Sequence, residues 1–362
     1  MHLLVACTDY PDLNGNKSLY FVHVRNQYYM NNGINVTVLN FSSKKNYNID
    51  NINVITLKNF IASNIKYNLL ICHAPNLRHH YKFIKKYNNK FENFILIFHG
   101  HEILKINKEY PPKYSFVKKT IPKVLQNMYD FVKLKIWRNF ILNNIQKLSL
   151  VFVSNYLFNS AMKYLDIDEL IIKKKSHIIN NAIGTIFEKE NYIINSNKEF
   201  DFITIRSNLD SSTYCIDLLC KIASQNPSLK FLLIGKGSFF DHNHLPKNVT
   251  LVKDHFNHEK LIDYINSAKG AIMLTRNDTQ GLMSCELATF GIPLITSKIP
   301  VTEEIMECFD NVTLIDNSEI NIDLNKWLLT NSNKIVPKCE KYFAKNTVMK
   351  EILLIKNLIN NA

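Results

Sequence analysis

The chain has 362 residues, 46% hydrophobic and 21% charged, a balance that excludes a disordered protein and fits two ordinary α/β domains. Its seven cysteines are scattered without a Cys-x-x-Cys pair, which argues against a zinc site or a disulfide framework and predicts a reduced, cytoplasmic location. The charge is uneven: residues 1–185 hold 25 Lys and Arg against 10 Asp and Glu, and the remainder holds 19 against 21. The basic half therefore predicts a polyanionic partner.

The predicted elements begin with an apolar run at residues 2–7, which indicates a buried first strand and not a signal peptide. A helix over residues 18–31 and a strand over 34–39 follow. Further strands are predicted at 67–72, 94–98, 150–153, 202–205, 231–234, 249–252, 271–274 and 294–296. Strands that alternate with helices pair in parallel, with helices on both faces of the sheet. No run of 18 apolar residues suggests a membrane span.

This order predicts an α/β protein with two Rossmann-like domains that face each other across a cleft. We expect an N-terminal acceptor-binding domain at residues 1–185 and a C-terminal donor-binding domain at 186–345. Ligands bind at the carboxyl ends of the strands in such sheets. Asp166 and Asp168 are expected at a helix end and not at a metal.

A basic segment lies within the first domain. Residues 103–147 carry ten basic side chains and two acids, interleaved with aromatic and aliphatic residues. This composition favours a helix that lies on an anionic membrane surface. A solvated helical face is the alternative. Nucleic acid is not expected as a partner, because no known nucleic-acid-binding motif accompanies the charge.

The most informative segment is residues 276–297, RNDTQGLMSCELATFGIPLITS. A strand ends there, a loop passes through Gly281, and a helix begins near Leu282. Gly281 allows close approach of the backbone, and the amides of Leu282 and Met283 at the helix start can bind a diphosphate. Glu286 follows one turn later, where its carboxylate can accept hydrogen bonds from ribose hydroxyls.

This segment resembles the family 4 glycosyltransferases of the two-Rossmann (GT-B) fold, of the type that builds bacterial surface polysaccharides. The resemblance rests on Asp278, the glycine turn, Glu286 eight positions later, and the Gly291-Ile292-Pro293 that follows. The family usually has Glu at the position of Asp278, which meets the donor sugar, so the shorter side chain affects which sugar fits.

Other motifs extend the resemblance. Gly235 lies in a turn similar to the family's I-G-x-G, and His99-Gly100 resembles the H-G that faces the donor sugar. The resemblance also places Gly15 on the acceptor side and Arg206 at the diphosphate, and His73, which follows a buried strand, is expected on the acceptor side as well. The family's second diphosphate ligand, a Lys, is replaced within residues 210–213. Either these hydroxyls and Arg206 suffice, or Lys236 serves instead.

The resemblance implies a retaining, metal-independent transferase without a cofactor, with His99 and Asp278 as catalytic residues. The expected donor is a UDP-linked hexose or N-acetylhexosamine. The expected acceptor is a lipid-linked or surface glycan of O-antigen or capsule synthesis, such as a polyprenyl-diphosphate oligosaccharide, on the inner membrane. Residues 346–362 are expected to form a helix that returns to the first domain. The alternatives are a non-catalytic partner in a glycan assembly complex and a nucleotide-sugar epimerase of the same fold.

Overall fold

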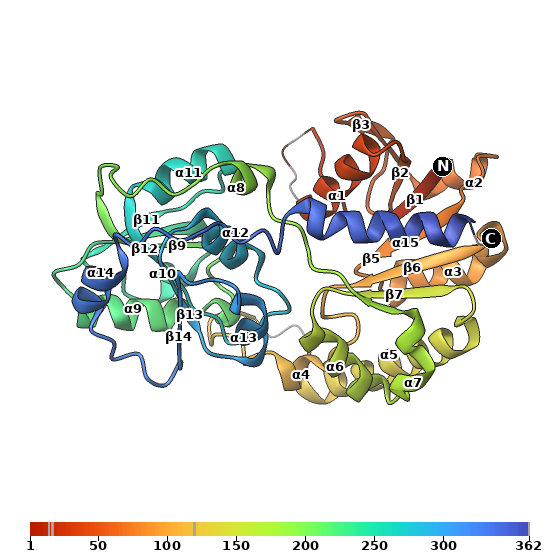
Figure 1. Cartoon of the computed structure of the whole chain (residues 1–362). Helices are drawn as coiled ribbons and strands as arrows, with labels where there is room; N and C mark the ends of the chain where they lie inside the picture. Colours follow the sequence, from red (N-terminus) through yellow and green to blue (C-terminus); the bar gives the residue numbers. More distant parts are fainter. Residues whose placement is uncertain (14, 16–17, 119–120, 361–362) are drawn as a thin grey trace. The chain divides into compact units, whose positions relative to one another are not determined.

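The computed structural model describes residues 1–13, 15, 18–118 and 121–360. They form two compact α/β units, each built on its own largely parallel sheet, which confirms the predicted fold class (Figure 1). Unit 1 comprises Met1–Ile106, Gln126–Ala182 and Phe343–Ala362, and unit 2 comprises Asn107–Leu125 and Ile183–Tyr342.

Unit 1 contains an eight-stranded sheet in the order β3-β4-β2-β1-β5-β6-β7-β8, parallel except for the β3–β4 pair. Its strands are β1 (His2–Cys7), β2 (Asn35–Asn40), β3 (Tyr47–Ile49), β4 (Ile52–Ile55), β5 (Leu69–His73), β6 (Asn93–Phe98), β7 (Leu148–Phe152) and β8 (Ser176–Ile178). The central strands are buried along nearly their whole length, because helices cover both faces of a parallel sheet.

Several helices of unit 1 start at side-chain caps, among them α6 (Asn155–Leu165) and α7 (Glu169–Ile172). Ser154 accepts a hydrogen bond from the Leu157 amide at the start of α6, and Asp168 does the same for Leu170 at the start of α7. Asp166 ends α6 and pairs with Arg138, so both acids lie at helix ends as predicted. The helices are α1 (Tyr20–Asn31), α2 (Leu57–Ala62), α3 (Lys82–Tyr87), α5 (Lys123–Asn144), α6 (Asn155–Leu165), α7 (Glu169–Ile172) and α15 (Val348–Asn360).

The C-terminal helix α15 packs in unit 1 beside α1 (Figure 1). Arg25 of α1 and Glu351 of α15 form an ion pair of 3.0 Å and are both fully buried. Arg25 also donates to Asn181 Oδ1 at 2.7 Å. Apolar residues of α15 join the core under the sheet, so this helix is an integral part of unit 1.

Unit 2 contains a six-stranded parallel sheet in the order β11-β10-β9-β12-β13-β14. Its strands are β9 (Phe200–Asn208), β10 (Phe231–Lys236), β11 (Val249–Val252), β12 (Ala268–Met273), β13 (Leu294–Ser297) and β14 (Val312–Ile315). Its helices are α8 (Thr185–Lys189), α9 (Ile216–Gln225), α10 (Phe239–His242), α11 (His258–Asn266), α12 (Leu282–Phe290), α13 (Pro300–Met306) and α14 (Leu324–Asn331).

One segment departs from the expected domain ranges. Residues 107–118 and 121–125 fall within the predicted first domain but belong to unit 2; they run from α4 (Ile106–Glu109) into the start of α5. The ring of Tyr114 meets Phe239 edge to face, and its hydroxyl donates to Asp217 Oδ1 at 2.7 Å. Phe116 stacks on His242. None of the described helices is both long and apolar enough to cross a bilayer.

Candidate functional site

The carboxyl edge of the unit 2 sheet gathers most of the predicted donor residues. Strands β10, β9 and β12 are adjacent in the sheet. Gly235 lies near the end of β10, Arg206 near the end of β9, and Asp278 in the loop between β12 and α12. Because parallel strands end at the same edge, three central strands bring these residues to one place.

Arg206 is a buried cation with spare hydrogen-bonding capacity. Its side chain is enclosed, its Nη2 donates to the Leu274 carbonyl at 2.6 Å, and its guanidinium lies over the Tyr214 ring at 4.9 Å. Burial lowers the pKa of Arg206, and Tyr214 and Asp278 oppose that shift. Its buried Nε has no hydrogen-bond partner within the described part of the chain. A guanidinium held in this way is suited to an anionic ligand.

Gly235 is required by packing. A Cβ at this position would lie 2.1 Å from the Arg206 carbonyl oxygen, so only glycine lets β10 end against the Arg206 backbone. The neighbouring Lys236 is half exposed and pairs with Asp254 at 3.2 Å. Lys236 therefore already has an acidic partner, which weakens its case as the substitute diphosphate ligand.

The loop before α12 is fixed by its own acid. Asp278 Oδ1 accepts hydrogen bonds from the amides of Thr279, Gln280 and Gly281 at 2.7, 3.2 and 2.8 Å. Gly281 has φ of +67° and stands at the N-cap of α12, a conformation that favours glycine. The first amides of the helix, those of Leu282 and Met283, have no acceptor within the helix and point from its positive end.

Glu286 is buried in α12 and accepts a hydrogen bond from the Gly184 amide at 3.0 Å. Burial raises the pKa of Glu286, while His258 and the Gly184 amide oppose the rise. His258 Nε2 lies 3.8 Å from the same carboxylate oxygen. Sequence reasoning missed Gly184 and His258, because neither belongs to a motif near Glu286. A Cβ at Gly184 would lie 2.4 Å from the His258 ring, so a larger residue there requires this ring to move.

In unit 1 the structure brings together two of the predicted residues, His73 at the end of β5 and His99 after β6. Their rings stack, and His73 Nδ1 lies 3.3 Å from His99 Nε2. Burial lowers the pKa of His99 to about 3 and, with Arg25, lowers that of His73 well below its usual value. The neutral form of both rings is therefore favoured at pH 7. Among the described side chains, His73 Nε2 is a buried atom without a hydrogen-bond partner.

Hydrogen bonds with two buried side chains, Glu102 and Lys133, hold the loop that carries His99 in place. Glu102 accepts from the amides of His99 and Gly100, and the buried Lys133 of α5 donates to the carbonyls of His101 and Leu104. Lys133 also pairs with Asp130 at 2.9 Å. These anchors were not predicted, since Lys133 and Asp130 read as ordinary surface charges in sequence. Gly15, the other predicted acceptor residue, is exposed in the loop before α1 with φ of +92°.

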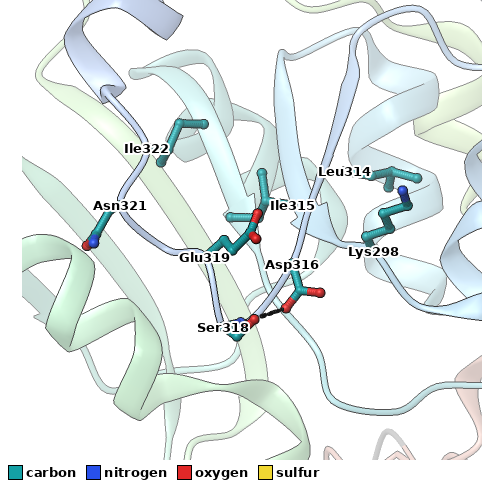
Figure 2. A pocket seen from close by; sticks show the side chains of 8 residues that line it. All are labelled: Lys298, Leu314, Ile315, Asp316, Ser318, Glu319, Asn321 and Ile322. Carbon is teal, nitrogen blue, oxygen red and sulfur yellow. Dashed lines mark hydrogen bonds between the residues drawn. The ribbon is translucent and has the colours of Figure 1, made fainter.

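A hollow at the edge strand β14 lies apart from these residues. Figure 2 shows its lining, in which Ser318 donates to Asp316 at 2.6 Å; Lys298 also lines the hollow. The hollow follows β13 and β14, whereas Arg206 and Gly235 follow β9 and β10. The hollow is therefore separate from the residues predicted to bind the donor.

The sequence matches no family model and no curated protein. Its fold, however, is that of solved glycosyltransferases. Sucrose-phosphate synthase from Thermosynechococcus elongatus is similar over 100% of both chains, with 13% identity and a TM-score of 0.72. A variant of S. aureus TarM, solved with fondaparinux, alpha-GlcNAc-glycerol and UDP, covers 99% of both chains (13% identity, TM-score 0.63). The catalytic domain of starch synthase IV from Arabidopsis thaliana, bound to ADP and acarbose, covers 99% of both (10%, 0.59). The chain thus has the GT-B fold.

Proposed function

We propose that the protein is a retaining glycosyltransferase that moves a hexose or N-acetylhexosamine from a nucleotide sugar, with UDP as the expected nucleotide. The observation that carries the proposal is the pair of anion-binding features at one edge of the unit 2 sheet. These are the buried guanidinium of Arg206 and the helix start that follows Gly281. The fold supports the proposal, since TarM and starch synthase IV were solved with UDP and ADP.

In the proposed mechanism, Arg206 and the amides of Leu282 and Met283 hold the diphosphate, and Glu286 accepts hydrogen bonds from the ribose. The bond between the anomeric carbon and the diphosphate oxygen breaks, and the electron pair leaves with the diphosphate. The acceptor oxygen then forms its bond on the same face and gives its proton to the departing phosphate. We assign Asp278 Oδ2 to the donor sugar in unit 2, and the catalytic role of His99 in unit 1 stays the prediction that the His99-Gly100 motif carries. Positioning and electrostatic stabilisation lower the barrier, and no metal or cofactor is assigned a role.

We assign the acceptor to unit 1, with Gly15 and His73 on its side. The excess of basic residues in 1–185 favours an acceptor held at an anionic surface. A polyprenyl-diphosphate-linked or surface glycan of O-antigen or capsule synthesis fits this charge. The protein would then work at the cytoplasmic side of the inner membrane as a peripheral protein, without nucleic acid.

The proposal is tested with a thermal-shift panel of UDP, GDP, ADP and CDP. A nucleotide at 100 times its Kd should stabilise the wild type by about 2.7 kcal/mol. Arg206→Gln should lose this shift, whereas the matched control Lys236→Gln should keep it, because Lys236 is already paired with Asp254. Circular dichroism checks that both variants fold. Transfer of the sugar from the selected donor is then followed by mass spectrometry.

One other function has an observation in its favour. The family's second phosphate ligand is missing, and the Tyr214 ring lies against Arg206. A non-catalytic partner in a glycan assembly complex would share these features. If no nucleotide stabilises the folded wild type, that alternative replaces the transferase.

A further inference from the structure

In the first half of α5, large apolar side chains are exposed and an ion pair is buried, which reverses the usual pattern of a surface helix. Four large side chains of its unit 1 part are between 49% and 63% exposed, and we call them the apolar face: Met128, Tyr129, Phe131 and Val132. The opposite side of the same turns buries the ion pair of Asp130 and Lys133. A surface helix in water normally turns its apolar side inward, so the apolar face indicates contact with something other than water.

The charge beside the apolar face is positive. Of the two acids in residues 103–147, Asp130 is buried and neutralised by Lys133. Lys123 and Lys135 are exposed on the same helix. A segment with ten basic residues therefore shows solvent almost no negative charge.

A second exposed apolar spot lies on α7, where charges of both signs surround it: Asp166, Asp168 and Glu169 are exposed, and Glu169 pairs with Lys173 at 3.6 Å. Leu170 and Ile171 are exposed there, and the exposed Lys173 and Lys174 follow them directly. The ion pair between Arg138 of α5 and Asp166 fastens α5 to the loop that leads into α7. α7 thus adds exposed apolar side chains to those of α5 but no net positive charge.

We propose that the apolar face of α5 inserts into the surface of an anionic phospholipid bilayer, with the neighbouring lysines on the headgroups. Apolar side chains that enter the acyl boundary, together with basic residues at headgroup level, are the features of a monotopic helix. A second copy of the chain fits less well, because it would bring like positive charges together. The inference deepens the proposed function, since a lipid-linked acceptor requires a protein held at the membrane.

Co-sedimentation with vesicles tests the proposal on the full chain without nucleotide. Vesicles of phosphatidylcholine with about 30% phosphatidylglycerol should retain the wild type, and part of the binding should persist at about 0.5 M salt, where charge attraction is screened. The triple variant Met128→Gln, Phe131→Gln, Val132→Gln should lower the partition about tenfold or more. The matched control Leu329→Gln, Ile335→Gln changes two side chains that are each 85% exposed on unit 2 and should bind as the wild type does.

Insertion itself is read from Phe131→Trp, with the wild type, which has Trp137 and Trp327, as the reference. The emission that the added tryptophan contributes should shift to the blue with anionic vesicles and be quenched by brominated lipid. Unchanged emission, or full retention of the triple variant, overturns the proposal. So does a wild type that is dimeric without vesicles when the triple variant is monomeric, because a second copy then covers the face. Vesicle binding by a protein that no nucleotide stabilises would leave this inference standing and remove the proposed transferase.

Discussion

Replacement of Glu286 by Gln should make the empty protein more stable and the nucleotide complex weaker. Burial raises the pKa of this carboxyl above its ordinary value of 4.5. The folded state thus holds the proton more tightly than the unfolded state, and stability falls as the pH rises from about 4.5 through the folded pKa. Gln keeps an oxygen for the Gly184 amide, 3.0 Å from Oε1 in the wild type, and has no charge to bury. We expect a higher Tm at pH 7 and no gain below pH 4.5.

The effect on binding has the opposite sign. A carboxylate that accepts hydrogen bonds from the ribose loses its charge in Glu286→Gln. Hydrogen bonds to charged groups contribute about 1.5–3 kcal/mol each, so the loss of one raises the Kd of the nucleotide by roughly 10- to 150-fold. Isothermal titration calorimetry at pH 7 measures the Kd, and differential scanning calorimetry measures the Tm.

Thr289→Val on the same helix is the matched control. The Thr289 hydroxyl is buried and has no partner within the described residues. Its removal should also stabilise the protein, by about 1 kcal/mol, but should leave the Kd unchanged. The reasoning is refuted if Glu286→Gln lowers the Tm and leaves the Kd as in the wild type. Glu286 would then be a structural partner of His258 and not a ligand for the nucleotide.

Two further predictions concern stability, and a third concerns a pair of cysteines. Gly235→Ala places a Cβ 2.1 Å from a backbone carbonyl and should lower the free energy of unfolding by several kcal/mol in urea; a loss under 1 kcal/mol contradicts the packing role. Glu351→Ala leaves Arg25 buried without its charge partner and should cost about 3–5 kcal/mol, much of it recovered in Arg25→Met, Glu351→Leu. Cys308 and Cys339, with sulfurs 2.7 Å apart, should cross-link under mild oxidation, faster at alkaline pH because burial raises the pKa of Cys308 to about 12; two thiols that still react with maleimide afterwards oppose this.

Much of the fold follows from local patterns. Apolar runs bounded by turn residues predicted most of the strands, and the helix expected at residues 346–361 corresponds to α15. The loop before α12 could also be predicted from the sequence, since Gly281 and the helix after it are recognisable from spacing alone. These features depend on neighbours in sequence, which is why a single sequence reveals them.

Contacts between residues that are distant in sequence could not be predicted. Nothing local indicates that Gly184 packs against the His258 ring, which would have to move for a larger residue. Nor does spacing show that Asp278 gives one oxygen to three amides of its own loop. The reversed pattern of α5 was hidden as well, since Asp130 and Lys133 appear as surface charges until a structure shows them buried.

The contacts of Tyr114 show how residues distant in sequence fix the loop before α12, which the sequence predicts to bind the donor. The Tyr114 hydroxyl donates a hydrogen bond to Asp217. Asp217 in turn accepts two hydrogen bonds from Arg276, of 2.6 and 3.0 Å. Arg276 precedes Asp278 by two residues, and its amide donates to the Thr213 carbonyl. A segment from the first half of the sequence thus fixes the start of the loop that ends at the α12 amides. A rigid loop positions backbone donors before a ligand arrives, so ordering them costs less free energy when a diphosphate binds.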